Sequence, residues 1–454
     1  MTVAVPQSSD SRDPSGVAGT QSTGEEQGTG FGYLLRNRDF RLIWFAQLSA
    51  QLADKFLMFS LIILAYRLSR GSTPVAVTLL AYTVPAVTIA PLAGVFADRY
   101  DRKLIMIGSN LIRALLIALI PIASFLPTLQ NDYPHLLLIT FAFAAVGQLF
   151  SPAEAAAIPS LISRRALITA NSMVLATMVI TLVIGGALAP IVSRVDIYAP
   201  YWIAVVLFVV AGVLIGLARI PKLRRGSDGS RAPRNPFHQL VLDLKAGAEA
   251  LGRSPVLLVA FYEMSLAVLV MFMMFTLAPA YVSQVLGIEA QDSYVILLPA
   301  TLGALLSAAV LGQLGRRLSP PRLLVGALVA TGLTLVLLAV VPALLTHVTA
   351  LQPHTRWFGS AFSFLLGLEF GLLVIPALSY LMEHTSDAVR GRIFSLLFMV
   401  INGVTALPVL LTAALSDLLG INRVVAGLGF LLIGTGLIVA RYARRVFGVQ
   451  AAPR

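Results

Sequence analysis

The chain has no cysteine, which excludes disulfide bonds, thiolate metal sites and a cysteine nucleophile. Histidine is scarce as well, and the few histidines form neither a cluster with metal-ligand spacing nor part of a Ser-His-Asp candidate set. All five lie outside the long apolar runs: His135, His238, His347, His354 and His384. We therefore expect no metal, no cofactor and no enzymatic activity.

Charged residues are also few. They make up 12% of the 454 residues, whereas 57% are hydrophobic. Water-soluble globular domains usually carry about 25% charged residues, so the composition predicts an integral membrane protein. The sequence also lacks a phosphate-binding loop of the form G-x-x-x-x-G-K-[ST], which argues against ATP as an energy source.

Apolar runs recur along the whole chain, each long enough to cross about 30 Å of hydrocarbon as a helix. The short alternating segments of a membrane β-barrel are missing, so the predicted fold class is all-α. We count twelve candidate spans, six in each half. Their cores are Leu42–Tyr66, Val75–Phe96, Leu104–Leu126, Leu136–Ile158, Ala170–Val192, Pro200–Ala218, Val256–Val282, Tyr294–Leu314, Leu323–Leu345, Phe358–Met382, Phe394–Ser416 and Asn422–Arg441.

Basic residues predict the orientation of these spans. With a cytoplasmic N-terminus, the cytoplasmic segments hold 26 of the 33 lysines and arginines, and Lys55 and Arg113 lie within spans. The predicted external loops hold only Arg67, Arg70, Arg194, Arg356 and Arg423. This bias predicts a multi-pass protein of the cell membrane with both termini cytoplasmic. It also accounts for the net charge of +12 without a nucleic-acid partner.

A basic stretch between the sixth and seventh spans, "PKLRRGSDGSRAPRNPF" (Pro221–Phe237), divides the chain into two halves. Apolar residues recur at helical spacing from Phe237 to Leu251, which predicts a short amphipathic helix on the cytoplasmic surface. A linker without a stable helix is the alternative. The predicted organisation is a disordered tail (1–32), a six-helix bundle (33–220), a linker (221–254), a second six-helix bundle (255–445) and a short tail (446–454).

Two stretches of the first half have counterparts in the second. "GVFADRYDRK", from Gly94, corresponds to "GQLGRRLSPPR", from Gly312, which lies 218 positions further on. Pro152 corresponds to Pro376 at an offset of 224. Similar offsets indicate an internal duplication, and two pseudo-symmetric six-helix repeats are typical of membrane transporters.

Together, the twelve spans, the basic central loop and the charged turn after the second span resemble the major facilitator superfamily. The stretches "ADRYDRKLIMIG", "ARIPKL" and "RGRIFSLL" are similar to the branch that contains macrolide-efflux proteins, siderophore exporters and lysophospholipid transporters. The resemblance covers about Tyr33 to Arg445. We expect a monomer whose partners are a small-molecule or lipid substrate, protons and membrane lipids.

The charged turn matches the loop pattern of the superfamily at Gly94, Asp98, Arg99, Arg102 and Lys103. The resemblance implies that Asp98 faces the start of the eleventh span, around Gly391–Phe394, and closes the cytoplasmic side. A helix N-terminus stabilises a carboxylate there, and Arg390 and Arg392 are expected to contribute. For Arg99, Arg102 and Lys103 the alternative is a role as membrane-surface anchors.

Charged side chains inside the spans are costly, about 2.5 to 3.5 kcal/mol at a helix centre for Arg, Lys or Asp. We therefore expect them to face a water-filled cavity or one another. Asp54, Glu263 and Glu369 are the candidates for binding and releasing the coupled proton. Arg113 and Lys55 are expected at the cavity, and Lys55 is expected to meet an acid on a neighbouring helix.

Gln47, Gln51 and Asp54 follow one another at intervals of four and three residues, so they share one face of the first span. A polar stripe on an apolar helix predicts cavity lining. Hydrogen bonding between helices is the alternative for the glutamines.

The sequence thus predicts a secondary active transporter that exports amphipathic small molecules, macrolide-like or siderophore-like, by proton coupling. "LVIGGALAPIV" (Leu182–Val192) keeps only part of the antiporter motif that such proteins carry in the fifth span. Two alternatives share the fold. One is a lysophospholipid flippase in which Arg113 or Lys55 binds the phosphate, and the other is a scaffold that does not transport.

Overall fold

The computed structural model describes residues 31–90, 93, 96, 100–127, 133–163, 166–221, 236–314, 320–345, 354–383, 385, 393, 396–397 and 399–450. The regular structure of these residues is helical, and they contain no strand. The fold class is all-α, as the sequence predicts. Ten of the described helices are long and apolar enough to cross a membrane, and two shorter apolar helices accompany them.

The first half contains a short entry helix followed by the six predicted spans. These helices are α1 (Phe31–Arg36), α2 (Arg38–Ser69), α3 (Ser72–Thr88), α5 (Arg102–Ala123), α6 (Tyr133–Ala157) with the 3-10 turn η1 (Ile158–Ser160), α7 (Leu167–Val195) and α8 (Ala199–Leu217).

The second half repeats this order of spans. Its helices are α9 (Pro236–Gly252), α10 (Pro255–Gln284), the 3-10 turn η3 (Ala290–Ser293), α11 (Tyr294–Leu314), α12 (Pro320–Leu345), α13 (Thr355–Glu383), the π-helical turn η6 (Val400–Val404), α15 (Ala406–Leu419) and α16 (Ile421–Gln450). The chain is therefore a polytopic membrane protein whose helices agree with two six-helix bundles.

Polar residues in the connecting turns fix several helix starts. The Asn37 side chain accepts hydrogen bonds from the backbone N–H groups of Asp39 and Phe40 at 3.1 and 3.2 Å and so caps α2. Asp101, inside the charged turn, accepts from the Lys103 N–H at 2.9 Å and caps α5. Such caps satisfy backbone donors that have no partner within the helix.

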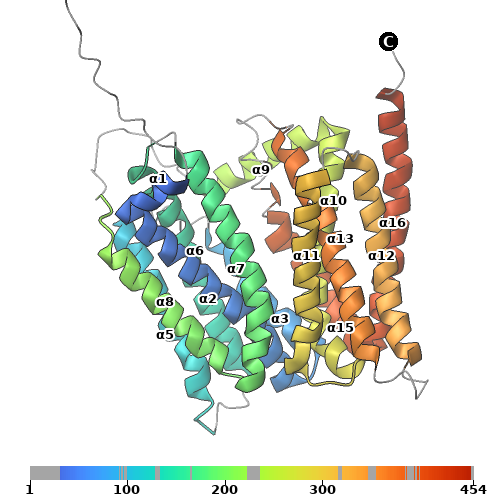
Figure 1. The fold of residues 1–454 in the computed structure, drawn as a ribbon, viewed down its shortest axis with the longest axis horizontal. Coiled ribbons are helices and arrows are strands. Elements are labelled where there is room, and N and C mark those ends of the chain that lie inside the picture. The colour runs from blue at the N-terminus through green and yellow to red at the C-terminus, as the bar shows by residue number, and fades with distance from the viewer. Residues whose placement is uncertain are drawn as a thin grey trace, which may run out of the picture.

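The helices pack into two bundles that lie side by side (Figure 1). In the first bundle α2 packs against α7 and α8, and α5 against α6 and α8. In the second, α11 and α12 pack against α13, and α12 also packs against α16. The bundles contact each other through α3 with α15 and α7 with α11. In Figure 1, α7 and α11 diverge toward the end of the molecule that carries α9.

Close contact between α11 and α13 depends on glycine. A Cβ atom at Gly367 would lie 1.7 Å from the carbonyl oxygen of Ala300, and one at Gly303 would lie 2.0 Å from that of Phe364. Neither position has room for a side chain, so the two backbones touch directly, as is common where membrane helices pack.

Helix α9 occupies the segment where the sequence predicts a short helix. Leu251, in its last turn, is buried together with Leu257 and Met264 of α10 and Leu381 of α13. The C-terminal end of α9 is thereby attached to the second bundle. Its place at the cytoplasmic membrane surface stays a prediction.

Candidate transport site

A polar cavity of about 280 Å³ lies inside the first bundle, between α2, α3, α5 and α6. Helix α2 contributes part of the predicted polar stripe, and α6 contributes side chains from its C-terminal half. The polar lining residues are Gln51, Asp54, Tyr82, Thr83, Arg113, Gln148, Ser151 and Glu154.

Arg113 and Asp54 both line this cavity, and they form an ion pair with each other. The Arg113 guanidinium lies over the rings of Phe143 and Phe208, 4.2 and 4.3 Å from their centroids. Gly147 leaves room for it, because a Cβ there would lie 3.3 Å from the guanidinium carbon. Ring faces attract cations, so these contacts fix Arg113 in place and leave Asp54 with a compensated charge.

Glu154 lines the same cavity in the last turn of α6, and the sequence interpretation did not single it out. The residue is only 8% exposed. Among the described residues its buried Oε1 atom has no hydrogen-bond partner, and no lysine or arginine forms an ion pair with it. Two carboxylates thus share one cavity in different states, one paired and one not.

A second cavity, of about 170 Å³, is apolar. Helices α10, α11, α12, α13 and α16 supply most of its wall, and the first bundle contributes Phe59 from α2 with Leu182 and Val183 from α7. Aliphatic side chains, leucine above all, make up most of the lining, and Met271, Met274, Phe275 and Phe370 add sulfur and aromatic surface. Among the described residues that line it, none is charged.

The predicted proton-coupling residues lie apart from one another. Glu369 is 6% exposed in α13 and accepts a hydrogen bond from the Thr334 hydroxyl at 2.7 Å. It is not in the cavity lining, although its neighbour Phe370 is. Glu263 is fully buried in α10, and its carboxylate oxygens have no hydrogen-bond partner within the described part of the chain. Of the three, only Asp54 lines a cavity.

The polar stripe of α2 is divided. Gln51 lines the cavity and also accepts a hydrogen bond from the Thr181 hydroxyl of α7 at 3.4 Å, so both interpretations of this glutamine apply. Gln47 is buried and does not belong to the lining.

Lys55 does not line the polar cavity either. It lies where α2 and α7 are in close contact, because a Cβ at Gly185 would lie 2.3 Å from the Lys55 Cβ. The described residues place no carboxylate oxygen within 4.0 Å of its amine, so the expected acid partner is not found among them.

The predicted cytoplasmic gate is only partly described, because Gly94, Asp98, Arg99, Arg390 and Arg392 lie outside the described residues. The two remaining basic residues are described at the start of α5. Arg102 donates to the Ala156 carbonyl oxygen at 2.8 Å, and Lys103 donates to the carbonyl oxygens of Gly216 and Ala218 at 2.8 Å. Both cations thus bind helix C-termini of their own bundle, where positive charge is stabilising.

The side-chain contacts that the described residues make between the bundles include three at the opposite end, where the predicted external loops lie. The Asp417 carboxylate of α15 accepts from the backbone N–H groups of Ser72 and Thr73 at 2.8 Å, and from the Thr73 hydroxyl at 2.7 Å. The N-cap residue of α3 is Gly71, which has no side chain to bind these donors. The second bundle therefore caps the first turn of α3.

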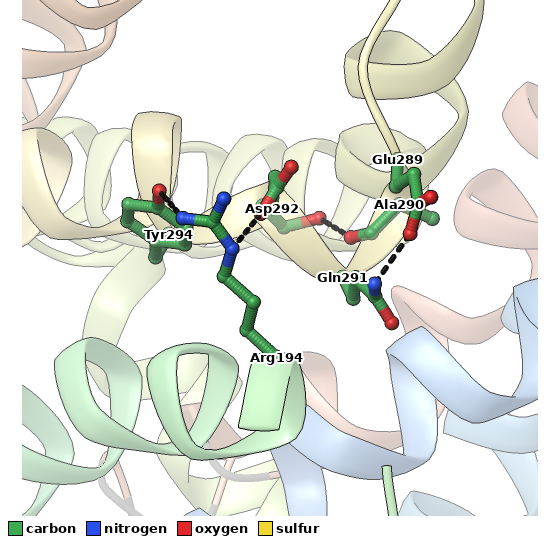
Figure 2. Close-up of polar contacts among 7 residues, drawn as sticks. Arg194, Glu289, Ala290, Gln291, Asp292 and Tyr294 are labelled. Carbon is green, nitrogen blue, oxygen red and sulfur yellow. Dashed lines mark hydrogen bonds and ion pairs between the residues drawn. The ribbon is translucent and has the colours of Figure 1, made fainter. Parts of the chain in front are cut away.

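Arg194, at the end of α7, makes a second contact between the bundles (Figure 2). Its guanidinium donates to the Tyr294 hydroxyl at 2.7 Å and forms an ion pair of 3.2 Å with Asp292 in η3. A third contact joins Tyr66 and Ser283, whose hydroxyl oxygens lie 2.5 Å apart. We refer to the contacts of Asp417, Arg194 and Tyr66 as the inter-bundle clasp.

Two helical bundles, a polar and an apolar cavity, and a clasp at one end define a polytopic transporter fold. Residues 43–408 match the Major Facilitator Superfamily, and the chain belongs to that family.

Proteins of similar sequence also belong to the class of membrane transporters. The chain is 22% identical to macrolide efflux protein A of Streptococcus pyogenes over 410 residues, which cover 88% of this chain and 93% of that protein. It is 27% identical to multidrug resistance protein MdtG of Enterobacter lignolyticus over 67% of each chain. An uncharacterized MFS-type transporter of Bacillus subtilis, YkuC, is 27% identical over 43% of this chain and 45% of its own length.

Solved structures show the same fold. The nucleoside transporter NupG superposes with a TM-score of 0.66 at 13% identity, over 89% of this chain and 100% of NupG. A bacterial homologue of the human lysosomal transporter Spinster, in an inward-facing and unoccupied conformation, gives 0.65 at 11% identity, over 92% and 97% of the two chains.

Proposed function

We propose that this transporter is a secondary active exporter of amphipathic small molecules, driven by proton exchange. One observation carries the proposal: α2 lines both cavities, with Asp54 in the polar one and Phe59 in the apolar one. Asp54 and Phe59 are five positions apart on this helix, which corresponds to about 7.5 Å along its axis. A molecule with a polar head and an apolar body fits this pair of environments.

The names of two relatives, macrolide efflux protein A and multidrug resistance protein MdtG, support amphipathic, drug-like substrates. Asp54, Glu263 and Glu369 are the proposed proton-coupling residues, because each is an acid inside a membrane-spanning helix. Alternating access would move the bundles about the clasp. In this arrangement, the clasp holds the predicted external side together, and Asp98 would take that role on the cytoplasmic side in the opposite state.

The geometry favours drug-like amphipathic compounds over lysophospholipid as substrates. Arg113 is paired with Asp54 and enclosed by two phenyl rings, so it is not free to bind a phosphate. Lys55 is not in the lining of the polar cavity.

The test uses purified protein in liposomes with an imposed pH gradient. Macrolides, cationic dyes, siderophores and lysophospholipids are offered in turn, and accumulation is measured with and without the gradient. We expect gradient-dependent movement of the amphipathic compounds, and its loss in at least one of Asp54→Asn, Glu263→Gln and Glu369→Gln. Full transport in all three variants would reject proton coupling, and movement of lysophospholipid alone would reject the substrate class.

A further inference from the structure

We infer that Glu154 is the residue that binds the positive charge of the substrate, so that the polar cavity takes the head group of a monovalent organic cation. This inference rests on the proposed function and adds the charge of the substrate to it. A substituted ammonium or a phosphonium group is the chemical class that the cavity fits.

The charges in the cavity are the first argument. Arg113 and Asp54 compensate each other as an ion pair, and Glu154 adds one negative charge without a partner among the described residues. The cavity therefore has an excess of one negative charge when Glu154 is ionised. A buried charge is costly unless it is paired, so the missing positive charge belongs to something that enters the cavity.

The position of Glu154 on its helix is the second argument. It lies in the last turn of α6, where the helix dipole disfavours negative charge. Two residues further on, the Ala156 carbonyl oxygen binds Arg102, as the dipole favours. Glu154 thus weakens the helix end, and a role in helix stability does not account for it.

The aromatic lining is the third argument. Tyr82 and Phe150 line the same cavity as Glu154, whereas the ring of Phe143 is already covered by the Arg113 guanidinium. Ring faces attract organic cations, and a carboxylate beside aromatic rings is a usual way to bind them. At about 280 Å³ the cavity admits a head group and leaves the apolar body to the second cavity.

The experiment compares two probes on the purified, full-length protein in detergent. Tetraphenylphosphonium carries a permanent positive charge, and triphenylphosphine oxide has three of the same rings and no charge. Dissociation constants are measured by calorimetry at pH 8. The wild type is expected to bind the cation at least tenfold more tightly than the neutral probe. Absence of this preference would overturn the inference.

Glu154→Gln keeps the shape of the side chain and removes its charge. We expect at least a tenfold loss of affinity for the cation and a change of less than twofold for the neutral probe. Glu154→Asp should keep most of the cation preference. The matched control is Ser151→Ala, one turn earlier on the same cavity wall, which should change both affinities alike. An equal loss for both probes in Glu154→Gln would overturn the assignment.

Gln148→Glu keeps the test decisive if Glu154→Gln does not fold. This variant adds a carboxylate to the same wall and should tighten cation binding at least threefold; an unchanged affinity would contradict the charge argument. Together with the liposome assay, these binding measurements distinguish a failure of the proposed function from a failure of the Glu154 assignment. Charge-dependent binding without transport would reject the exporter and keep Glu154, whereas transport with an unaltered cation preference in Glu154→Gln would reject only Glu154.

Discussion

The two bundles share a helical plan, but the cavities that they line differ in chemistry. The first surrounds an ion pair and an unpaired carboxylate, and the second contributes most of the wall of a cavity without charged lining among its described residues. The predicted internal repeat allows the two halves to be compared residue by residue. Pro152 corresponds to Pro376, and Ala153 and Ala377 are both fully buried, but the position of Glu154 corresponds to Leu378. The buried alanine is thus the same in both halves, and the side chain that follows it differs.

This difference predicts that the bundles depend on different forces. The first bundle holds its site by pairing charges, since Arg113 and Asp54 are each costly alone. The second holds its shape by backbone contact at glycine, as between α11 and α13. Substitutions that remove the ion pair from the first bundle, or the glycine contact from the second, test this comparison.

The largest effect is expected from Arg113→Met. It leaves Asp54 without its partner and removes the contacts with Phe143 and Phe208, which should lower the free energy of unfolding by about 3 kcal/mol. Thermal and denaturant unfolding in detergent measure this loss. The double variant Arg113→Met with Asp54→Asn should recover part of it, because no charge is then left unpaired. A single variant as stable as the wild type would contradict the role of the ion pair.

Gly367→Ala tests the second bundle. The added Cβ would lie 1.7 Å from the Ala300 carbonyl oxygen, so α11 and α13 must separate. We expect a loss of about 2 kcal/mol in the free energy of unfolding. Gly326→Ala in α12 is the matched control, since nothing lies within 4 Å of a Cβ there and alanine favours the helix. Equal stability of the two variants would show that close contact at Gly367 is not required.

Asp417→Asn acts between the bundles. The substitution removes the charge and one acceptor oxygen, and the weakened cap on α3 should cost about 1 kcal/mol of clasp stability and shift the population toward separation at the predicted external end. Because the chain has no cysteine, Val183→Cys gives a single label site in the apolar cavity. Labelling by a membrane-impermeant thiol reagent from outside should rise several-fold.

The control for this experiment is Asp196→Asn. Asp196 accepts a hydrogen bond from the Tyr198 N–H at 3.0 Å within the first bundle and makes no described contact with the second. Its labelling should match that of the parent protein. The same increase in both aspartate variants would point to general loosening and would refute the clasp.

Ala304→Leu should give the smallest effect. The larger side chain enters the apolar cavity, so it competes with the apolar body of a substrate for about 170 Å³ of space. Affinity for triphenylphosphine oxide should fall about threefold, equivalent to ~0.7 kcal/mol, with little change in stability. Ala86→Leu, in the polar cavity, is the counterpart, and a greater loss of neutral-probe binding there would reverse the assignment of the two cavities.

The sequence predicts most of the fold, because span length and apolar composition are local properties. Twelve candidate spans correspond to described helices, and the family follows from loop motifs. The partner of Asp54 was not predictable, since Arg113 lies 59 positions away and the pairing depends on how α2 and α5 pack. Likewise, nothing near Ser72 indicates that an aspartate 345 positions away caps its helix.

Glu154 could have been found. Gln148, Ser151 and Glu154 follow one another at intervals of three residues, a polar stripe on an apolar span of the same kind as Gln51 with Asp54.

The cap on α3 also bears on how the protein is made. Asp417 is synthesised 345 residues after Ser72, roughly 20 to 70 s later at typical elongation rates of about 5 to 20 residues per second. Until then the start of α3 has no side-chain cap, and its free N–H groups must be satisfied by water or by the insertion machinery. The first bundle can therefore complete this helix end only after nearly the whole chain has left the ribosome.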